Sequence, residues 1–269
     1  MSKQAQEVSQ GERFEFGANW ASFLSVLSEE RIAQARTSLG TMLQTDSLAG
    51  KTFLDIGSGS GLFSLAARRM GAKVISFDYD PQSVACTREL KRRYFPDDDG
   101  WTVEQGSVLD HAFLESLGQF DVVYSWGVLH HTGRMWAALD NVVSRVKRGG
   151  KLFIAIYNDQ GGPSRRWLKL KQIYNAHHAL RLPLSIYTLI RQWGVTALKG
   201  KFPSSWRNYK AQRGMSAWHD IVDWIGGLPF EVAKPEEIFD FYHARGFQLE
   251  RLKTCGGGLG CNEYVFVKD

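Results

Sequence analysis

The sequence predicts an α/β fold in which helices cover both faces of a largely parallel β-sheet. Five apolar, β-rich runs alternate with helical stretches between residues 50 and 158. Strands that alternate with helices form parallel sheets, because each crossover helix packs on a face of the sheet. Two more apolar runs, 247–254 and 262–268, flank a glycine-rich segment and predict a terminal β-hairpin. We therefore expect one α/β core with additions before it and after its fifth strand.

The expected elements follow one another in a simple order. Residues 1–12 are polar and predict no regular structure, whereas 14–43 predict one or two helices. The five strands are expected at 52–56, 72–78, 101–105, 120–126 and 150–157. The helices between and after them are expected at 61–70, 82–94, 111–117, 134–147 and 234–246. Prolines break the helical pattern of the segment after the fifth strand, at Pro163, Pro183 and Pro203.

These elements divide the chain into four regions with different expected roles. The regions are N-terminal helices that cover the ligand site (1–49), the ligand-binding core (50–158), a basic helical insert that caps the substrate (159–233), and a C-terminal helix and hairpin that complete the core sheet (234–269).

The composition is that of a soluble globular protein and argues against several other classes. Of 269 residues, 43% are apolar and 23% are charged. No apolar run reaches the roughly 18 residues that a membrane-spanning helix needs, and residues 1–16 lack the apolar stretch of a secretory signal. The three cysteines have no C-x-x-C spacing, so we expect neither a disulfide framework nor a metal site. A cytoplasmic location fits this cysteine usage.

The charge of the chain is distributed unevenly. The segment 160–219 contains eleven lysines and arginines and no aspartate or glutamate, whereas the rest of the chain has 22 basic and 28 acidic residues. A body with a charge of −6 therefore carries an insert with a charge of +11.

A glycine-rich loop follows the first predicted strand. Asp55 ends the strand, and Gly57, Gly59 and Gly61 follow in a D-x-G-x-G-x-G pattern. The dinucleotide fingerprint G-x-G-x-x-G would need glycine at position 62, which is Leu62. Glycines let the backbone turn sharply and approach a ligand closely. A carboxylate beside this loop would repel phosphate and attract a cation, so the pattern favours a cationic nucleoside over a dinucleotide.

The ends of the second and third strands supply further polar groups. Asp78 ends the second strand, where an acid can accept hydrogen bonds from both hydroxyls of a ribose. Asp80 precedes a proline and is expected to cap the next helix. Tyr79 could lie against an adenine ring or simply pack. After the third strand, Ser107 and Val108 could meet the edge of an adenine, unless Ser107 caps the next helix, a role for which Asp110 competes.

Three segments resemble the first, second and fourth motifs of class I S-adenosylmethionine-dependent methyltransferases. They are FLDIGSGSGLFS, VISFDYDPQSV and FDVVYSWGVLHHT, which begin at positions 53, 74 and 120. The resemblance covers roughly residues 50–157. The segment FGANWASFL and the order of elements are similar, more distantly, to ubiquinone-pathway O-methyltransferases. The resemblance implies a Rossmann-like, seven-stranded, mostly parallel sheet with an antiparallel last strand, and S-adenosylmethionine as the cofactor.

The resemblance also implies which residues bind the cofactor. Around the methionine part it places Asp55, Gly57, Ser58, Gly59 and Gly61. It places Asp78 on the ribose, and Ser107 and Val108 at the adenine, and Tyr79 is a further candidate for binding the cofactor. Near the reacting methyl group it places Ser125, Trp126 and Gly127. Trp20 could close over the cofactor from the N-terminal helices, or it could fix those helices to the core.

Two histidines are candidates for a catalytic base. A hydroxyl acceptor must lose its proton during methyl transfer, and histidine is suited to take it near neutral pH. His130 and His131 follow the fourth strand, and His130 is preferred because it lies nearer the strand end. Either one could instead be structural. The sequence SWGVLHHT stands where amine methyltransferases carry an Asn/Asp-Pro-Pro-Tyr motif, which argues against amide and base amines as acceptors.

The basic insert leaves several partners open. It mixes basic, aromatic and aliphatic residues and follows the fifth strand, close to the expected ligand site. It could cap an anionic or lipophilic small molecule, lie on an anionic membrane, bind nucleic acid, or only cover the site. A nucleic-acid partner is disfavoured, because the overall charge is modest and no recognition motif occurs. The sequence does not determine the oligomeric state.

The sequence as a whole predicts a methyltransferase that uses S-adenosylmethionine. We expect a small-molecule acceptor and transfer to a hydroxyl. The alternatives are methylation of an amine, of RNA or of protein, and a protein that binds the cofactor without catalysis.

Overall fold

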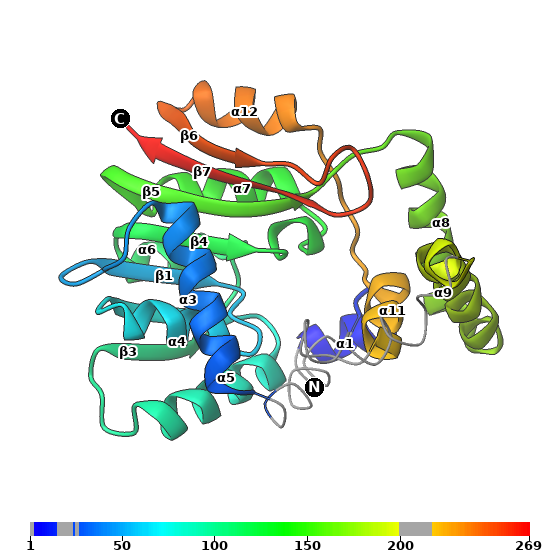
Figure 1. Cartoon of the computed structure of the whole chain (residues 1–269), viewed down its shortest axis with the longest axis horizontal. Coiled ribbons are helices and arrows are strands. Elements are labelled where there is room, and N and C mark those ends of the chain that lie inside the picture. The colour runs from blue at the N-terminus through cyan, green and yellow to red at the C-terminus, as the bar shows by residue number, and fades with distance from the viewer. Residues whose placement is uncertain (1–2, 15–23, 25–26, 199–216) are drawn as a thin grey trace.

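The computed structural model describes residues 3–14, 24, 27–198 and 217–269. The described residues form one seven-stranded sheet in the order β3-β2-β1-β4-β5-β7-β6 (Figure 1). The first five strands are parallel: β1 (Thr52–Ile56), β2 (Lys73–Asp78), β3 (Trp101–Gln105), β4 (Phe120–Trp126) and β5 (Val146–Tyr157). The last strand, β7 (Cys261–Lys268), is antiparallel to both β5 and β6 (Phe247–Lys253). The predicted fold is confirmed.

Helices cover both faces of the sheet, and each face has its own apolar core. One core contains residues of α3 (Glu29–Leu43), α4 (Leu62–Arg69) and α5 (Pro81–Tyr94). The other contains residues of α6 (His111–Leu117), α7 (Met135–Val143) and α12 (Pro235–His243). The strands between them are buried on both faces, which explains their continuous apolar runs.

The helices that follow the strands begin at predictable caps. Asp80 is the N-cap of α5, where its Oδ1 accepts a hydrogen bond from the backbone N–H of Gln82 at 2.8 Å. Asp110 caps α6 in the same way through the N–H of Phe113. The capping role predicted for Asp80 is confirmed, and Asp110 rather than Ser107 caps α6. These caps fix where the chain turns after β2 and β3 and so place the neighbouring loops.

Two predicted boundaries are wrong. The helix expected at 134–147 ends at Val143, and Val146 already pairs with Phe120 in β5. The apolar spacing there fits either a helix or a buried strand, and an irregularity in the β4–β5 ladder, beside Gly149, lets the strand begin early. The N-terminal residues, expected without regular structure, include the short helix α1 (Lys3–Ser9).

Between β5 and α12 the chain forms a separate group of helices. They are α8 (Gly162–Ala176), the 3-10 turn η2 (His178–Leu180), α9 (Arg181–Leu198) and α11 (Ala217–Gly226). Figure 1 shows them, with α1, beyond the carboxyl ends of the parallel strands. A third apolar cluster, which includes Trp167, Tyr174 and Ile225, holds them together. None of the helices in the described part of the chain is long and apolar enough to cross a bilayer.

Candidate active site

A large cavity lies at the carboxyl ends of the parallel strands. Its volume is about 1530 Å³. The loops after β1, β2, β3 and β4 form one wall, which is where open α/β sheets bind ligands. The opposite wall comes from α1, α9, α11 and the turn between β6 and β7. The predicted site residues that line the cavity are Asp55, Gly57, Ser58, Gly59, Asp78, Tyr79, Ser107, Val108, Trp126, Gly127 and His131.

The remaining predicted residues lie elsewhere. Gly61 is the N-cap residue of α4, behind the loop. Ser125 is buried, and its hydroxyl donates to the carbonyl of Ile56 at 3.0 Å, so it joins β4 to β1 instead of facing the cavity. His130 is fully buried beneath the cavity wall. Trp20 lies outside the described residues.

The loop after β1 can adopt its shape only with glycine at its first turn. Gly57 has a φ of 77°, in the left-handed region that other residues rarely adopt. A Cβ at this position would lie 2.4 Å from a methyl carbon of Val128, which belongs to the loop after β4. The two loops therefore touch through the bare backbone of Gly57, and this contact sets the floor of the cavity.

Asp55 presents a buried carboxylate at the end of β1. Its Oδ2 accepts a hydrogen bond from the hydroxyl of Ser64 at 2.5 Å. The Ser64 hydroxyl also lies 2.6 Å from that of Ser76, which in turn accepts from the indole N–H of Trp101. Burial, and to a lesser degree the neighbouring charge of Asp78, raises the pKa of Asp55 to about 7. The carboxylate is held in place by polar groups that do not neutralise it.

Asp78 presents a second, partly buried carboxylate at the end of β2. Its Oδ2 accepts from the backbone N–H of Gly59 and its Oδ1 from that of Asp80, both at 2.9 Å. Burial raises its pKa to about 6, although these hydrogen bonds favour the charged form. Asp78 therefore fixes the glycine loop and also faces the cavity that the loop encloses.

Helix α1 closes the cavity next to Tyr79. The phenol hydroxyl of Tyr79 donates to Glu7 at 3.3 Å, and the guanidinium of Arg13 lies 4.9 Å from the centre of its ring. Arg13 also pairs with Glu7 at 2.7 Å and donates to the carbonyl of His131 at 3.0 Å. These contacts join the N-terminal segment to the loops after β2 and β4. The polar sequence of α1 gave no signal of this role.

His131 lies in the cavity wall, in the short 3-10 turn Leu129–His131 that follows β4. Its Nδ1 lies 2.5 Å from the carbonyl oxygen of Pro229. Because a carbonyl can only accept, Nδ1 carries the proton and Nε2 holds the lone pair. Burial lowers the pKa of His131 to about 3, so the ring is neutral at pH 7.

His130 is turned the other way and belongs to the core. Its Nδ1 accepts from the backbone N–H of Tyr157 at 3.3 Å, which places the ring proton on Nε2. That Nε2 is buried and has no hydrogen-bond partner among the described residues. The ring packs against Tyr157, with ring centres 4.0 Å apart, and burial lowers its pKa well below the ordinary value. Of the two histidines, only His131 therefore lines the cavity.

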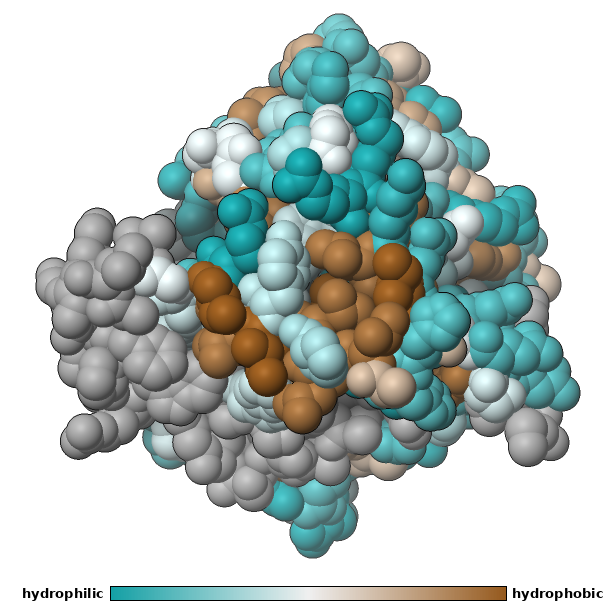
Figure 2. Space-filling model, turned by 90° about the vertical axis from the view of Figure 1, so that its right-hand side faces the viewer, coloured by the Kyte–Doolittle hydropathy of each residue, from teal (hydrophilic) through white to brown (hydrophobic). Residues whose placement is uncertain are grey.

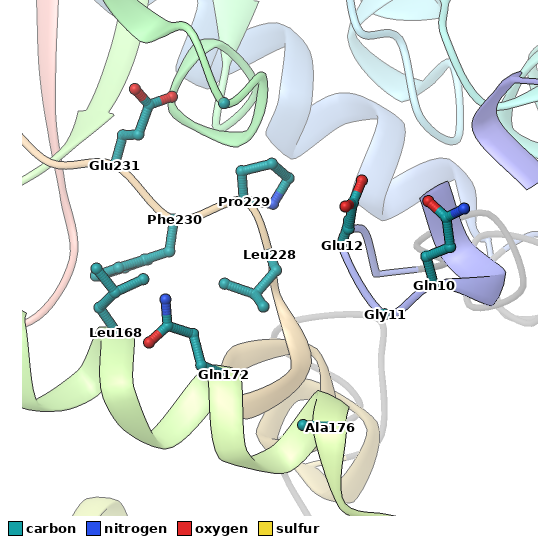
Figure 3. A pocket seen from close by; sticks show the side chains of 11 residues that line it. Gln10, Gly11, Glu12, Leu168, Gln172, Ala176, Leu228, Pro229, Phe230 and Glu231 are labelled. Atoms are coloured by element: carbon teal, nitrogen blue, oxygen red, sulfur yellow. The ribbon is translucent and has the colours of Figure 1, made fainter. Parts of the chain in front are cut away.

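The segment that orients His131 is itself packed between two parts of the molecule. Residues 228–231 run beside a second, smaller cavity of about 450 Å³. Figure 3 shows Leu168 and Gln172 of α8 on one side of this cavity and Glu12 on the other. The carboxylate of Glu231 accepts from the N–H of Met135 at 2.9 Å and so ties the segment to α7. The Pro229 carbonyl is thus held beneath His131.

The wall opposite the strands is aromatic and has a buried cation behind it. Trp224 of α11 and Tyr157 at the end of β5 line the cavity and pack edge to face, with ring centres 5.3 Å apart. Lys171 of α8 is fully buried, contacts the Trp224 carbonyl, and lies 4.5 Å from the ring centre of Trp224 and 4.8 Å from that of Phe230. The mixture of basic and aromatic residues in the insert indicated a cap, but it did not show which of them face the site.

Comparison with known sequences identifies relatives of this chain. A family model described as a methyltransferase domain matches residues 27–205. A ubiquinone biosynthesis O-methyltransferase of Xanthomonas euvesicatoria is 35% identical over 118 residues, 41% of this chain and 45% of that protein. The protein of the same name from Escherichia coli is 31% identical over 137 residues, 50% of this chain and 52% of that protein. The chain spans about half the length of these curated relatives.

Solved structures share the fold over most of the chain. Magnesium protoporphyrin IX methyltransferase from Synechocystis, with bound S-adenosylhomocysteine, superposes with a TM-score of 0.55 at 15% identity, over 88% of this chain and 83% of that one. At this identity the likeness extends to the fold alone.

Proposed function

The chain belongs to the S-adenosylmethionine-dependent methyltransferase family, and from this premise we propose that it methylates a hydroxyl oxygen of a small molecule. The observation that carries the proposal is the position of His131, which lines the cavity after β4 and whose Nδ1 is engaged by the Pro229 carbonyl. The relatives described above are named O-methyltransferases, which supports oxygen as the accepting atom.

The cofactor half of the cavity fits S-adenosylmethionine. Asp55 and Asp78 lie close enough that the charge of Asp78 raises the pKa of Asp55. Neither forms an ion pair with a lysine or arginine of the described residues. Two desolvated carboxylates without a cation are costly, and a positively charged ligand relieves that cost. Asp55 would face the charged methionine part, Asp78 the ribose hydroxyls, and Ser107 and Val108 the adenine.

The protein's part in the transfer is to align the reactants and to exclude water from them. When bound, S-adenosylmethionine supplies a methyl group that is already activated on a sulfonium sulfur. Gly127 and Trp126 end β4 next to the place where the acceptor oxygen would approach. The aromatic side chains of Tyr157, Trp193 and Trp224 form an acceptor wall that excludes water and suits an aromatic ring.

His131 removes the proton of the acceptor hydroxyl. With S-adenosylmethionine bound, the acceptor oxygen would receive the activated methyl group and would have to give up its O–H proton, and Nε2 of His131 would take that proton. The oxygen becomes strongly acidic during this step, so a histidine whose pKa is as low as about 3 can still accept the proton. The Pro229 carbonyl stabilises the imidazolium through the Nδ1 proton. This contact gives Pro229 a positioning role.

The test compares the two neighbouring histidines. We expect His131→Ala to lower the turnover of a phenol acceptor by roughly 10²–10⁴-fold while the affinity for S-adenosylhomocysteine is kept. The matched control is His130→Asn, whose side-chain oxygen can still accept from the Tyr157 N–H, and it should retain most of the rate. A panel of catechols and phenols serves as the acceptor, with S-adenosylhomocysteine formation as the readout.

Two results would count against this proposal. An undiminished rate in His131→Ala would remove the general base. Turnover with amines but with none of the phenols would move the acceptor atom from oxygen to nitrogen.

A further inference from the structure

Helix α9 exposes an apolar face. Leu182, Ile186 and Ile190 are 61%, 44% and 63% exposed, and their spacing of four residues places them in one row on the helix. No charged residue occurs between positions 182 and 190. A surface helix of a globular protein ordinarily turns its apolar stripe inward and its polar side to water, so this arrangement is reversed.

The other side of α9 is firmly packed. Ser185 and Thr188 are buried, and the Thr188 hydroxyl donates to the carbonyl of Leu184 at 2.8 Å. The helix contacts both α8 and α11, and Trp167 of α8 lies 6.3 Å from Tyr187, measured between ring centres. Packing on α8 and α11 therefore fixes the orientation of α9, and in this orientation the apolar row faces outward.

Neighbouring residues extend this row into a patch, which we call the α9 patch. Its members are Ile173, Leu180, Leu182, Ile186, Tyr187 and Ile190, each at least 37% exposed. Figure 2 shows brown side chains gathered on the side of the molecule where Figure 1 places α8 and α9. Contiguous exposed apolar surface of this kind marks an interaction site.

The charged residues of the segment that carries the α9 patch are all basic. The exposed cations of this region are Arg165, Arg166, Lys169, Arg181 and Arg191. No aspartate or glutamate occurs anywhere from residue 160 to residue 219. An apolar surface with a basic rim is complementary to the headgroups and acyl chains of an anionic bilayer.

We propose that the α9 patch docks on an anionic lipid surface. The apolar row would enter the boundary between headgroups and acyl chains, and the arginines and lysine would contact lipid phosphates. A second copy of the chain is a poorer occupant, because a symmetric contact would bring two basic rims together with no acidic residue of this segment to pair with them.

The docked helix is also part of the cavity wall. Gln192 and Trp193 of α9 line the cavity, one turn or less beyond Ile190. A lipophilic acceptor could then pass from the bilayer to the cavity along α9. This last step rests on the proposed methyl transfer, whereas the docking itself does not.

The experiment is co-sedimentation of the full chain with vesicles, without cofactor or acceptor. We expect binding to vesicles of equal parts phosphatidylglycerol and phosphatidylcholine, little binding to phosphatidylcholine alone, and weaker binding as salt is raised. Ile186→Gln with Ile190→Gln should weaken binding by roughly tenfold or more, because two apolar side chains no longer leave water. Both positions are exposed and glutamine is a good helix former, so the fold is retained.

A matched control distinguishes binding through the α9 patch from non-specific hydrophobic binding to vesicles. Phe239→Gln with Leu252→Gln removes two similarly exposed apolar side chains outside the insert and should bind like the unaltered chain. Equal binding by the α9 double variant, or no binding of the unaltered chain to anionic vesicles, would overturn the proposal. So would a dimer in solution that the α9 double variant converts to a monomer, because the patch would then be an interface between copies. Since no turnover is measured, failure here is separate from failure of the methyl-transfer proposal.

Discussion

The two walls of the cavity are built in different ways. The wall at the strand ends comes from one continuous part of the chain, residues 55–134, and its polar groups are fixed by short hydrogen bonds such as that from the Gly59 N–H to Asp78. The opposite wall is assembled from α1, the insert and the β6–β7 turn, and it is held by aromatic packing around Lys171. The first wall is thus specified locally, whereas the second depends on contacts between distant segments. Accordingly, the first should tolerate little change in its backbone, and the second should respond to changes in packing.

The largest effect on cofactor affinity is expected at Gly57. Gly57→Ala adds a Cβ that overlaps Val128 and strains a backbone with φ of 77°, so the loop must move. We expect the affinity for S-adenosylhomocysteine, measured by calorimetry, to fall by roughly a hundredfold or more. The control is Gly50→Ala, which has a similar φ of 73° but nothing within 4 Å of the added carbon. If both variants lost affinity for S-adenosylhomocysteine equally, the loss would come from backbone strain alone and not from the contact between the two loops.

A smaller effect is expected from pH, through the carboxylates of Asp55 and Asp78. Their pKa values of about 7 and about 6 mean that both take up protons as the pH falls toward 5. A cationic ligand prefers the charged forms, so the affinity for S-adenosylmethionine should rise with pH and level off above about 7. The slope should approach about tenfold per pH unit for each carboxylate that must lose a proton.

The same pKa shifts make the ligand-free protein less stable as the pH rises, whereas the affinity for the ligand increases. A raised carboxyl pKa means that the folded state binds more protons than the unfolded state. The contribution of these two groups to the free energy of unfolding is therefore highest below about pH 4, and it is lost as the pH rises through 6 to 7. Asp78→Asn should flatten the lower part of the affinity profile. An affinity for S-adenosylmethionine that does not change between about pH 5 and about pH 7.5 would contradict a cation site.

The smallest effect is expected at Lys171, in the opposite wall. Lys171→Met keeps most of the side-chain volume but removes the cation from between Trp224 and Phe230. We expect the KM for a phenol acceptor to rise by roughly three- to tenfold, with the affinity for S-adenosylhomocysteine unchanged. The exposed Lys169 of the same helix supplies the control variant, Lys169→Met. If Lys171→Met weakened the binding of the phenol and of S-adenosylhomocysteine equally, the two walls would not bind the two ligands independently.

The same contrast explains what the sequence could predict. Asp55 and Asp78 were predictable because strand ends and glycine turns are local patterns, and the structure places both in the cavity. The sequence favours His130 over His131 only by its distance from the strand end, whereas a single 3-10 turn buries the His130 ring in the core and brings His131 to the cavity. Helix α1 was missed because its residues carry no apolar period; it meets the cavity through contacts more than 70 residues away, such as Glu7 with Tyr79.

The connection between the insert and the sheet has an evolutionary consequence. After α11 the chain returns to the sheet through a short extended segment, where the Ala233 N–H donates to the Tyr157 carbonyl at 3.0 Å and Ala233 forms an isolated bridge with Asn158. The insert thus leaves and rejoins the sheet at adjacent points, and its helices have an apolar cluster of their own. On the proposal that the insert forms the acceptor wall, substitutions in it, or even replacement of the whole helical group, would alter acceptor preference without moving the carboxylates at the ends of β1 and β2. Selection can therefore diversify substrates on an inherited cofactor site.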